Sequence, residues 1–202
     1  MADHYFSRKP GVAARLREVE VELGGRRLAM RTSSGVFSGD GLDHATRHLL
    51  DRLDDEAPSV APDPARVLDL GCGWGPIALA LATHWPDAEV WAVDVNERAL
   101  ELTAGNAERH DLAVTTSLPE DVPADLQFDE IWSNPPIRIG KHALHELLLL
   151  WLDRLTEDGT MTMVVGRQLG ADSLQRWLVD QGWPTERIGT AKGFRLLRTR
   201  RP

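Results

Sequence analysis

Short apolar segments alternate with helix-length amphipathic segments from residue 66 to the end of the sequence. The pattern predicts strands over 66–70, 89–94, 112–116, 128–133, 160–165, 185–190 and 193–199, and helices over 76–84, 96–109, 141–156 and 171–181. This alternation is typical of a parallel sheet with helices on both faces. The link between the last two strands is too short for a parallel crossover, so we expect an antiparallel hairpin there. The prediction is an α/β fold with a seven-stranded doubly wound sheet whose last strand is antiparallel.

A smaller unit precedes this sheet. Residues 18–23 alternate between polar and apolar, a Gly-Gly pair follows, and 26–32 resume extended character, which predicts a β-hairpin. Apolar residues recur at helical spacing over 41–53, and the proline-rich run 54–64 resembles a linker. We therefore expect an N-terminal hairpin and helix extension, 1–60, packed on a core, 61–202, with one structural domain overall.

Composition narrows the class of protein. A length of 202 residues suits one compact domain, and no apolar run approaches 18 residues. We expect a cytoplasmic protein without a membrane partner, either a monomer or a weak dimer. The single cysteine, Cys72, excludes an internal disulfide or a cysteine-based metal cage, and no metal site is expected.

A glycine-rich loop follows the first strand of the predicted sheet. Asp69-x-Gly71-x-Gly73-x-Gly75 lies where doubly wound sheets bind ligands, at the carboxyl end of a strand. The third glycine falls one residue early for a dehydrogenase fingerprint, and Pro76 occupies a position that must be small there. The helix that starts at Pro76 can receive the carboxylate of an amino-acid-like ligand.

An acid at the end of the next strand completes the pattern. Asp94 follows Gly71 by 23 residues, a place from which a carboxylate can bind both ribose hydroxyls. A ribose-bearing amino-acid cofactor is S-adenosylmethionine. The alternative is that the glycines serve sheet packing alone, with Asp94 as a helix N-cap.

The fourth strand runs into Asn134-Pro135-Pro136. Two prolines fix φ and remove two N–H donors, so this turn offers rigid hydrogen-bond acceptors. The Asn134 side-chain oxygen and the Pro135 carbonyl could accept the hydrogens of an exocyclic base amine and favour the geometry that attacks a methyl group. The alternative is an ordinary strand-ending turn, for which Asn-Pro is common.

With these motifs in place, the chain resembles class I S-adenosylmethionine-dependent methyltransferases with a Rossmann-like fold. The resemblance is to the "small domain" group, which includes the ribosomal RNA small-subunit methyltransferase C family and its short stand-alone relatives. It covers nearly the whole chain. The matching segments are His4–Ser7, Gly35–Ser38, Leu42-Asp43, Thr46, Leu49-Leu50, Val67–Gly75, Asp94–Asn96, Asn106, Asn134–Arg138, Gly140-Lys141, His145–Leu147 and Lys192–Arg195.

The resemblance implies roles for a number of residues in and beside these segments. The cofactor would lie against Phe37, which closes over the site, and against Asp69, Gly71, Gly73, Asp94, Val95, Ser117, Leu118 and Asn134. The target amine would be oriented by Asn134, Pro135 and Pro136. The substrate would lie near Ile137, Arg138, Lys141 and Arg195. Relatives often have an acid where Leu118 stands and an aromatic residue where Ile137 stands, so adenine recognition through the backbone is expected, and a base has no aromatic ring to stack on at Ile137.

Charge bears on the substrate. The formal net charge is −8, which argues against a nucleic-acid partner, but residues 1–39 carry +3, 40–186 carry −17 and 187–202 carry +6. The basic ends leave RNA, ribosomal RNA above all, as the favoured partner. We expect methyl transfer to a base amine, guanine N2 foremost, with S-adenosylhomocysteine as product. The alternatives are a small-molecule or protein N-methyltransferase on the same fold, and a non-catalytic module that binds the cofactor.

Overall fold

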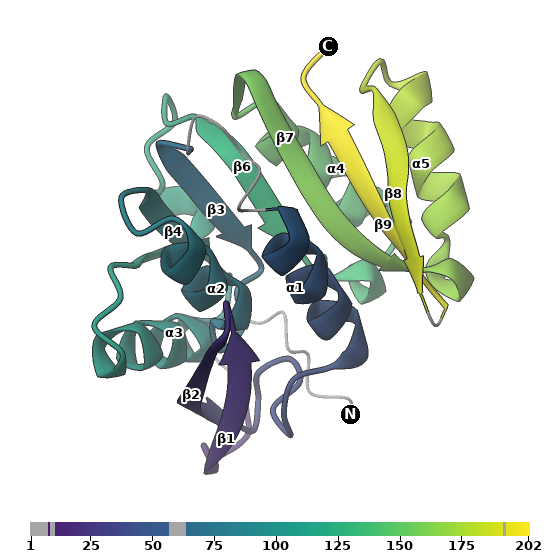
Figure 1. Cartoon of the computed structure of the whole chain (residues 1–202). Coiled ribbons are helices and arrows are strands. Elements are labelled where there is room, and N and C mark those ends of the chain that lie inside the picture. Colours follow the sequence, from purple (N-terminus) through teal and green to yellow (C-terminus); the bar gives the residue numbers. More distant parts are fainter. Residues whose placement is uncertain (1–7, 9–10, 57–63, 192) are drawn as a thin grey trace.

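The computed structural model describes residues 8, 11–56, 64–191 and 193–202 (Figure 1). The segment His4–Ser7, Lys192 and residues 57–63 of the expected linker lie outside the described residues. Residues 54–56 of that linker are the last turn of a helix rather than linker.

A seven-stranded sheet forms the centre of the molecule (Figure 1). Its strands are β3 (Arg66–Leu70), β4 (Glu89–Val93), β5 (Thr115–Ser117), β6 (Phe128–Ser133), β7 (Leu155–Gly166), β8 (Thr185–Ala191) and β9 (Phe194–Arg200). The order across the sheet is β5-β4-β3-β6-β7-β9-β8, and β9 is antiparallel to both of its neighbours. The doubly wound sheet with an antiparallel last strand is therefore confirmed. The chain reverses direction across the sheet between β3 and β6, the place where such folds bind ligands.

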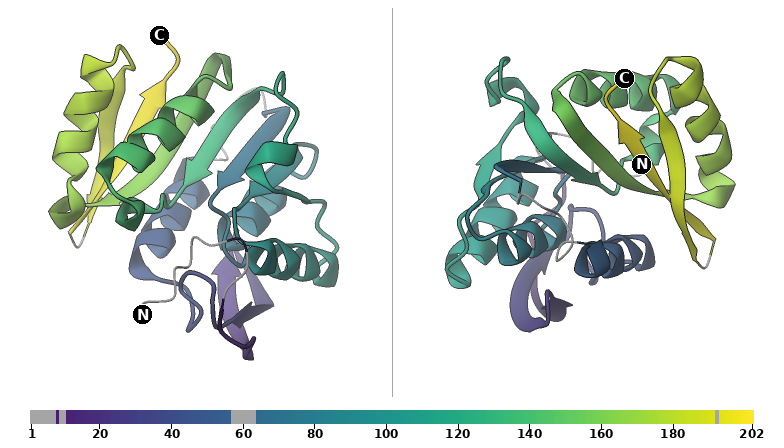
Figure 2. Two further views of the ribbon diagram at one scale, coloured as in Figure 1. Left: turned by 180° about the vertical axis from the view of Figure 1, so that it is seen from behind. Right: turned by 45° about the horizontal axis from the view of Figure 1, so that its top comes forward.

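Helices cover both faces of the sheet. Helices α1 (His44–Glu56), α2 (Pro76–His84) and α3 (Glu97–Arg109) lie on one face, and α4 (Lys141–Leu152) and α5 (Ala171–Asp180) lie on the other (Figures 1 and 2). Short 3₁₀ turns follow three strands: η2 (Pro119–Asp121), η3 (Ile137–Ile139) and η4 (Arg167–Leu169). None of the helices in the described part of the chain has the length and apolarity to cross a membrane.

The alternating side chains of the strands supply two hydrophobic clusters. In β3, Val67 packs with the helices of one face, whereas Leu68 packs with those of the other. Both side chains are fully buried, as period-two alternation in a sheet covered on both faces requires.

The N-terminal hairpin, β1 (Leu16–Leu23) and β2 (Arg26–Ser33), packs against α2 and α3. Its apolar side chains belong to the same cluster as α1. Asn106 of α3 fastens the hairpin to the glycine loop. Its Nδ2 atom donates to the carbonyls of Arg31 and Trp74, each at 2.8 Å, and its Oδ1 atom accepts the Arg31 N–H at 2.7 Å.

Several element boundaries differ from the sequence prediction. The strand expected over 112–116 is β5 at 115–117, because Leu112 closes the end of α3 through its N–H bond to the Ala107 carbonyl. The helix expected over 141–156 ends at Leu152, and the strand expected over 160–165 begins earlier, at Leu155, because Leu155 pairs with Phe128 of β6. An irregularity in the β6–β7 ladder accommodates the longer strand.

Candidate active site

The glycine loop connects β3 to α2 and is hydrogen-bonded to the end of β4. The backbone N–H groups of Gly71 and Cys72 donate to the Val93 carbonyl at 2.8 and 3.1 Å. Gly71 has φ +79°, and a Cβ atom there would point into open space. A bare backbone facing an open space lets a ligand approach closely.

Asp94 follows β4 and is bonded to the glycine loop. Its Oδ2 atom accepts the Gly73 N–H and its Oδ1 atom accepts the Asn96 N–H, both at 2.9 Å. Burial raises the pKa of Asp94, although the backbone donors oppose that shift. A carboxylate has about four lone-pair positions, so these backbone donors leave acceptor capacity for a ligand. The N-cap of α3 is Asn96, which accepts the Arg98 N–H, so Asp94 is not the capping residue itself.

Asp69 lies beneath the loop. It is fully buried, and its Oδ2 atom accepts the Ala78 N–H at 2.9 Å in the first turn of α2. Its Oδ1 atom has no hydrogen-bond partner among the described residues. Burial, reinforced by the nearby charge of Asp94, raises the pKa of Asp69 well above its ordinary value. Asp69 therefore supports the loop and helix, and a charge on it is costly.

The Asn-Pro-Pro turn follows β6 at the same edge of the sheet. The Pro135 carbonyl accepts the Ile137 N–H at 2.8 Å, and Pro136 has φ −74° and ψ 69°, the geometry of an inverse γ-turn. One lone pair of this carbonyl is thus engaged within the turn, and the other remains for a substrate.

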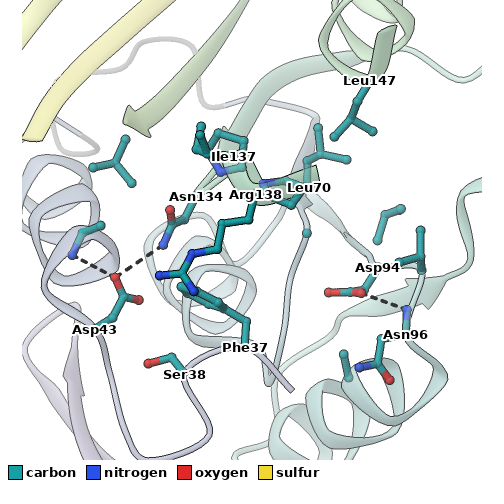
Figure 3. A pocket seen from close by; sticks show the side chains of 18 of the residues that line it. Phe37, Ser38, Asp43, Leu70, Asp94, Asn96, Asn134, Ile137, Arg138 and Leu147 are labelled. Atoms are coloured by element: carbon teal, nitrogen blue, oxygen red, sulfur yellow. Dashed lines mark hydrogen bonds between the residues drawn. The ribbon is translucent and has the colours of Figure 1, made fainter. Parts of the chain in front are cut away.

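The amide of Asn134 contacts the N-terminal end of α1. Its Nδ2 atom lies 3.0 Å from Thr46 Oγ1 and 3.5 Å from Asp43 Oδ1. In Figure 3 the nitrogen faces Asp43 and the oxygen points away from it. The oxygen of Asn134 is therefore the end of the amide that is left for a ligand.

These groups surround a cavity of about 400 Å³ (Figure 3). Asp94 lies on one side of it and Asn134 on another, and Gly71 is also part of the lining (Figure 3). The structure thus brings together most of the residues expected at the site: Phe37, Gly71, Asp94, Val95, Asn134, Pro135, Pro136, Ile137 and Arg138 all line the cavity.

Other expected site residues do not line this cavity. Asp69 lies beneath the loop, and Gly73 belongs to the loop without lining the cavity. Beyond β5 the lining residue is Pro119 rather than Ser117 or Leu118. Ser117 acts through its backbone, since its carbonyl accepts the Asp94 N–H at 3.4 Å.

The basic residues divide into free and engaged groups. Arg138 and Lys141 are exposed and form no ion pair with any residue that the structure describes; Lys141 lines a neighbouring cavity of about 150 Å³. The C-terminal arginines, in contrast, bind the protein itself. The contacts are Arg195 with Asp172 at 3.5 Å, Arg198 with Thr162 at 3.1 Å, Arg200 with Glu186 at 3.0 Å, and Arg201 with the Leu155 carbonyl. Arg195, whose side chain is 12% exposed, does not line the cavity.

Sequence reasoning assigned no role to Asp43 and Thr46. Asp43 lines the cavity, and both residues contact Asn134. The one local signal was an aspartate directly before a helix, which predicts an N-cap. The described residues contain no cluster of His, Cys, Asp and Glu suited to a metal ion.

Comparison with known proteins identifies relatives of the chain. A Bacillus subtilis protein, YbxB, is 31% identical over the full length of both chains; its name assigns no function. Ribosomal RNA small subunit methyltransferase C of Klebsiella pneumoniae is 36% identical over 56% of this chain and 32% of its own length. Release factor glutamine methyltransferase of Geobacter sulfurreducens is 45% identical over 45% of this chain and 32% of its own length. The chain thus spans about one third of the two relatives whose activity is named.

A solved structure shares the fold. The T. thermophilus 16S rRNA guanine-N2 methyltransferase RsmC, in complex with AdoMet and guanosine, superimposes with a TM-score of 0.80 at 23% identity. The match covers 93% of this chain and 51% of that one. The Rossmann-like methyltransferase fold is therefore confirmed.

A protein-family model also matches most of the chain. The model named "Methyltransferase small domain" matches residues 27–198, which include the glycine loop, Asp94 and the Asn-Pro-Pro turn. The prediction of an S-adenosylmethionine-dependent methyltransferase is confirmed at the level of the family, and the chain belongs to the methyltransferase small domain family.

Proposed function

We propose that the protein transfers a methyl group from S-adenosylmethionine to the exocyclic amine of a base in RNA, with guanine N2 as the target. The observation that carries this proposal is the Asn134 side-chain oxygen, an acceptor at the wall of the same cavity as Asp94. A base amine donates hydrogens, so a rigid acceptor at that place suits it.

The cavity fits the cofactor in two respects. Gly71 leaves room for a ligand against the backbone, and the Asp94 carboxylate keeps acceptor capacity for the ribose hydroxyls. Phe37 and Val95, both partly exposed at the cavity wall, supply apolar surface beside it. When bound, the cofactor supplies a methyl group on a positively charged sulfur.

The work of the chain's own residues is to orient the amine. The lone pair of a base amine is delocalised into the ring, which makes the nitrogen a poor nucleophile. Asn134 Oδ1 and the free lone pair of the Pro135 carbonyl accept the two amine hydrogens, which turns the nitrogen lone pair towards the methyl group. With the cofactor bound, transfer would form the nitrogen–carbon bond as the methyl–sulfur bond breaks, S-adenosylhomocysteine would leave, and the proton of the amine would pass to solvent. Catalysis of this kind rests on positioning and electrostatics.

RNA as substrate is supported by a relative and by two free cations. The Klebsiella relative bears the name of a ribosomal RNA methyltransferase. Arg138 lies at the cavity wall and Lys141 at the neighbouring cavity, and both are exposed, so they are available to phosphate groups.

A protein amide is the second candidate substrate. The Geobacter relative is named a release factor glutamine methyltransferase, and an amide nitrogen has the same donor geometry and the same weak nucleophilicity as a base amine. A non-catalytic module is disfavoured because cofactor binding alone has no need for the acceptor at Asn134.

The N-terminal extension is part of this proposal. Residues 1–60 and 61–202 act as one unit because α1 supplies the contacts to Asn134.

The test is transfer of labelled methyl groups from the cofactor to total RNA, total protein and a small-molecule extract in parallel. Label in RNA supports the proposal. Label confined to the protein fraction supports the glutamine-type alternative.

A further inference from the structure

The Asn134 amide is held by two residues of the N-terminal extension, 88 and 91 positions away in the sequence. Thr46 is buried, with 4% of its surface exposed, in the first turn of α1. Its hydroxyl donates to Asp43 Oδ2 at 2.6 Å and so spends its one hydrogen there. The lone pairs of Oγ1 then accept from Asn134 Nδ2 at 3.0 Å.

Asp43 is itself fixed by the helix that it precedes. Its Oδ1 atom accepts the N–H groups of Ala45 and Thr46 at 2.9 and 3.1 Å, which is the arrangement of an N-cap. The same oxygen lies 3.5 Å from Asn134 Nδ2. An ionised carboxylate only accepts hydrogen bonds, so both groups that face the amide are acceptors.

This arrangement selects one orientation of the amide. The side-chain amide of asparagine is nearly symmetrical in shape, and rotation by 180° exchanges its oxygen and nitrogen. With Nδ2 against α1, two donor–acceptor contacts form. With Oδ1 there, the amide oxygen would face the Asp43 oxygen, and the Thr46 hydroxyl could donate to the amide only by giving up its bond to Asp43 Oδ2.

We propose that Asp43 and Thr46 are positioning residues that keep Asn134 Oδ1 directed into the cavity. The inference rests on the proposed function of Asn134 as acceptor for the target amine. A reversed amide would present an N–H donor to a substrate that is also a donor and would block the productive pose. The N-terminus of α1 thus determines that the oxygen of the Asn134 amide, and not its nitrogen, faces the substrate.

The first experiment compares two substitutions of one hydroxyl. Thr46→Val keeps the shape and removes the acceptor, whereas Thr46→Ser keeps the acceptor. We expect Thr46→Val to lower kcat about tenfold, because the hydrogen bond that orients the Asn134 amide is lost. The cofactor Kd should stay unchanged. In Thr46→Ser, which keeps the hydroxyl, kcat should stay within about threefold of the wild type. Equal loss in both variants would overturn the proposal, since it would indicate a packing defect.

The second experiment is a double-mutant cycle. Because Thr46 acts through Asn134, Thr46→Val should change the residual rate of Asn134→Ala by less than about twofold. Additive losses would show that Thr46 acts elsewhere and would contradict the proposal.

A control variant separates hydroxyl loss from positioning. Thr185 is also buried, and its hydroxyl lies 3.0 Å from both the Trp183 carbonyl and Thr199 Oγ1, between β8 and β9. Thr185→Val should leave kcat unchanged, and its unfolding free energy gives the cost of losing a buried hydroxyl. A fall in kcat equal to that of Thr46→Val would mean that the loss is unspecific.

A third measurement is independent of activity. The two side-chain amide hydrogens of Asn134 are assigned by NMR from their loss in Asn134→Ala. We expect Thr46→Val, and not Thr185→Val, to shift these signals and to speed their exchange with solvent. Unchanged signals in Thr46→Val would overturn the positioning role even if methyl transfer to RNA is found. Shifted signals in a protein that methylates no substrate would support the contact while the proposed function fails.

Discussion

The Asp94 carboxylate accepts the backbone N–H of Gly73 at 2.9 Å, which ties the end of β4 to the loop that follows β3. Two motifs that are 21 residues apart are therefore one structural unit. A change in the acid should therefore alter the loop as well as the group that we propose to face the ribose.

The first prediction concerns this acid. Asp94→Ala should weaken cofactor binding by about 100-fold or more. The variant loses the hydrogen bonds between the carboxylate and the ribose, and the Gly73 N–H of the loop loses its acceptor. Calorimetric titration with S-adenosylmethionine gives the Kd. Asp87→Ala is the matched control, because Asp87 is exposed at the opposite end of β4. Near-normal affinity of Asp94→Ala would reject the ribose assignment.

The second prediction concerns the two buried acids. Burial raises the pKa values of Asp69 and Asp94, so the folded, unliganded protein retains protons that the unfolded chain releases. The free energy of unfolding should fall as pH rises from about 4, the ordinary pKa of a carboxyl group, through the raised values, and level off above them. Asp69→Asn keeps the acceptor for Ala78 and carries no charge, so its decline should be shallower. Urea unfolding at a series of pH values measures both slopes; parallel curves would contradict the account.

The third prediction applies one substitution at two glycines. At Gly75, φ is +95° and a Cβ atom would lie 2.9 Å from Thr103, so Gly75→Ala should cost about 1–3 kcal/mol. Gly105 is exposed within α3 with no atom within 4 Å of such a Cβ, so Gly105→Ala should stabilise by about 0.5–1 kcal/mol. Chemical denaturation gives both values. A change of the same sign at both glycines would show that backbone conformation does not decide the outcome.

The fourth prediction concerns the free cations. The double variant Arg138→Gln with Lys141→Gln should raise the KM for RNA and make the salt dependence of the rate shallower by about one to two units in the log–log slope. Arg200→Gln is the control, because Arg200 is already paired with Glu186. An unchanged salt slope in the double variant would place the RNA contact elsewhere. Removal of residues 198–202 is a poor test of RNA binding, since β9 pairs with β7 through them.

The sheet and the cofactor side of the site could be predicted from sequence because their signals are local. Apolar runs such as that of β3 need burial on both faces, and Gly71 and Gly75 adopt positive φ within a short segment. The boundary of β5 could not be predicted, because Leu112 and Val114 are apolar yet pack at the end of a helix rather than in a strand.

The features that sequence could not supply are contacts between distant residues. The arginines near the C-terminus look like an RNA-binding face in sequence, but Asp172, Glu186 and Thr162 engage them. The contact of Thr46 with Asn134 joins residues 88 positions apart and has no periodic signal. Such relationships depend on the packing of whole elements.

The most direct test of the central claim is nucleoside mass spectrometry of RNA methylated by the purified protein, with wild type and Asn134→Ala compared at saturating cofactor. We expect the wild type to methylate an exocyclic amine, which is detected as N2-methylguanosine. We expect a rate about 100-fold or more lower for Asn134→Ala, whose calorimetric Kd for the cofactor stays near that of the wild type, because Asn134 acts mainly in the transition state. Equal turnover by the two proteins, or a methyl group found only on a ring nitrogen, a ribose or protein, would contradict the proposed function.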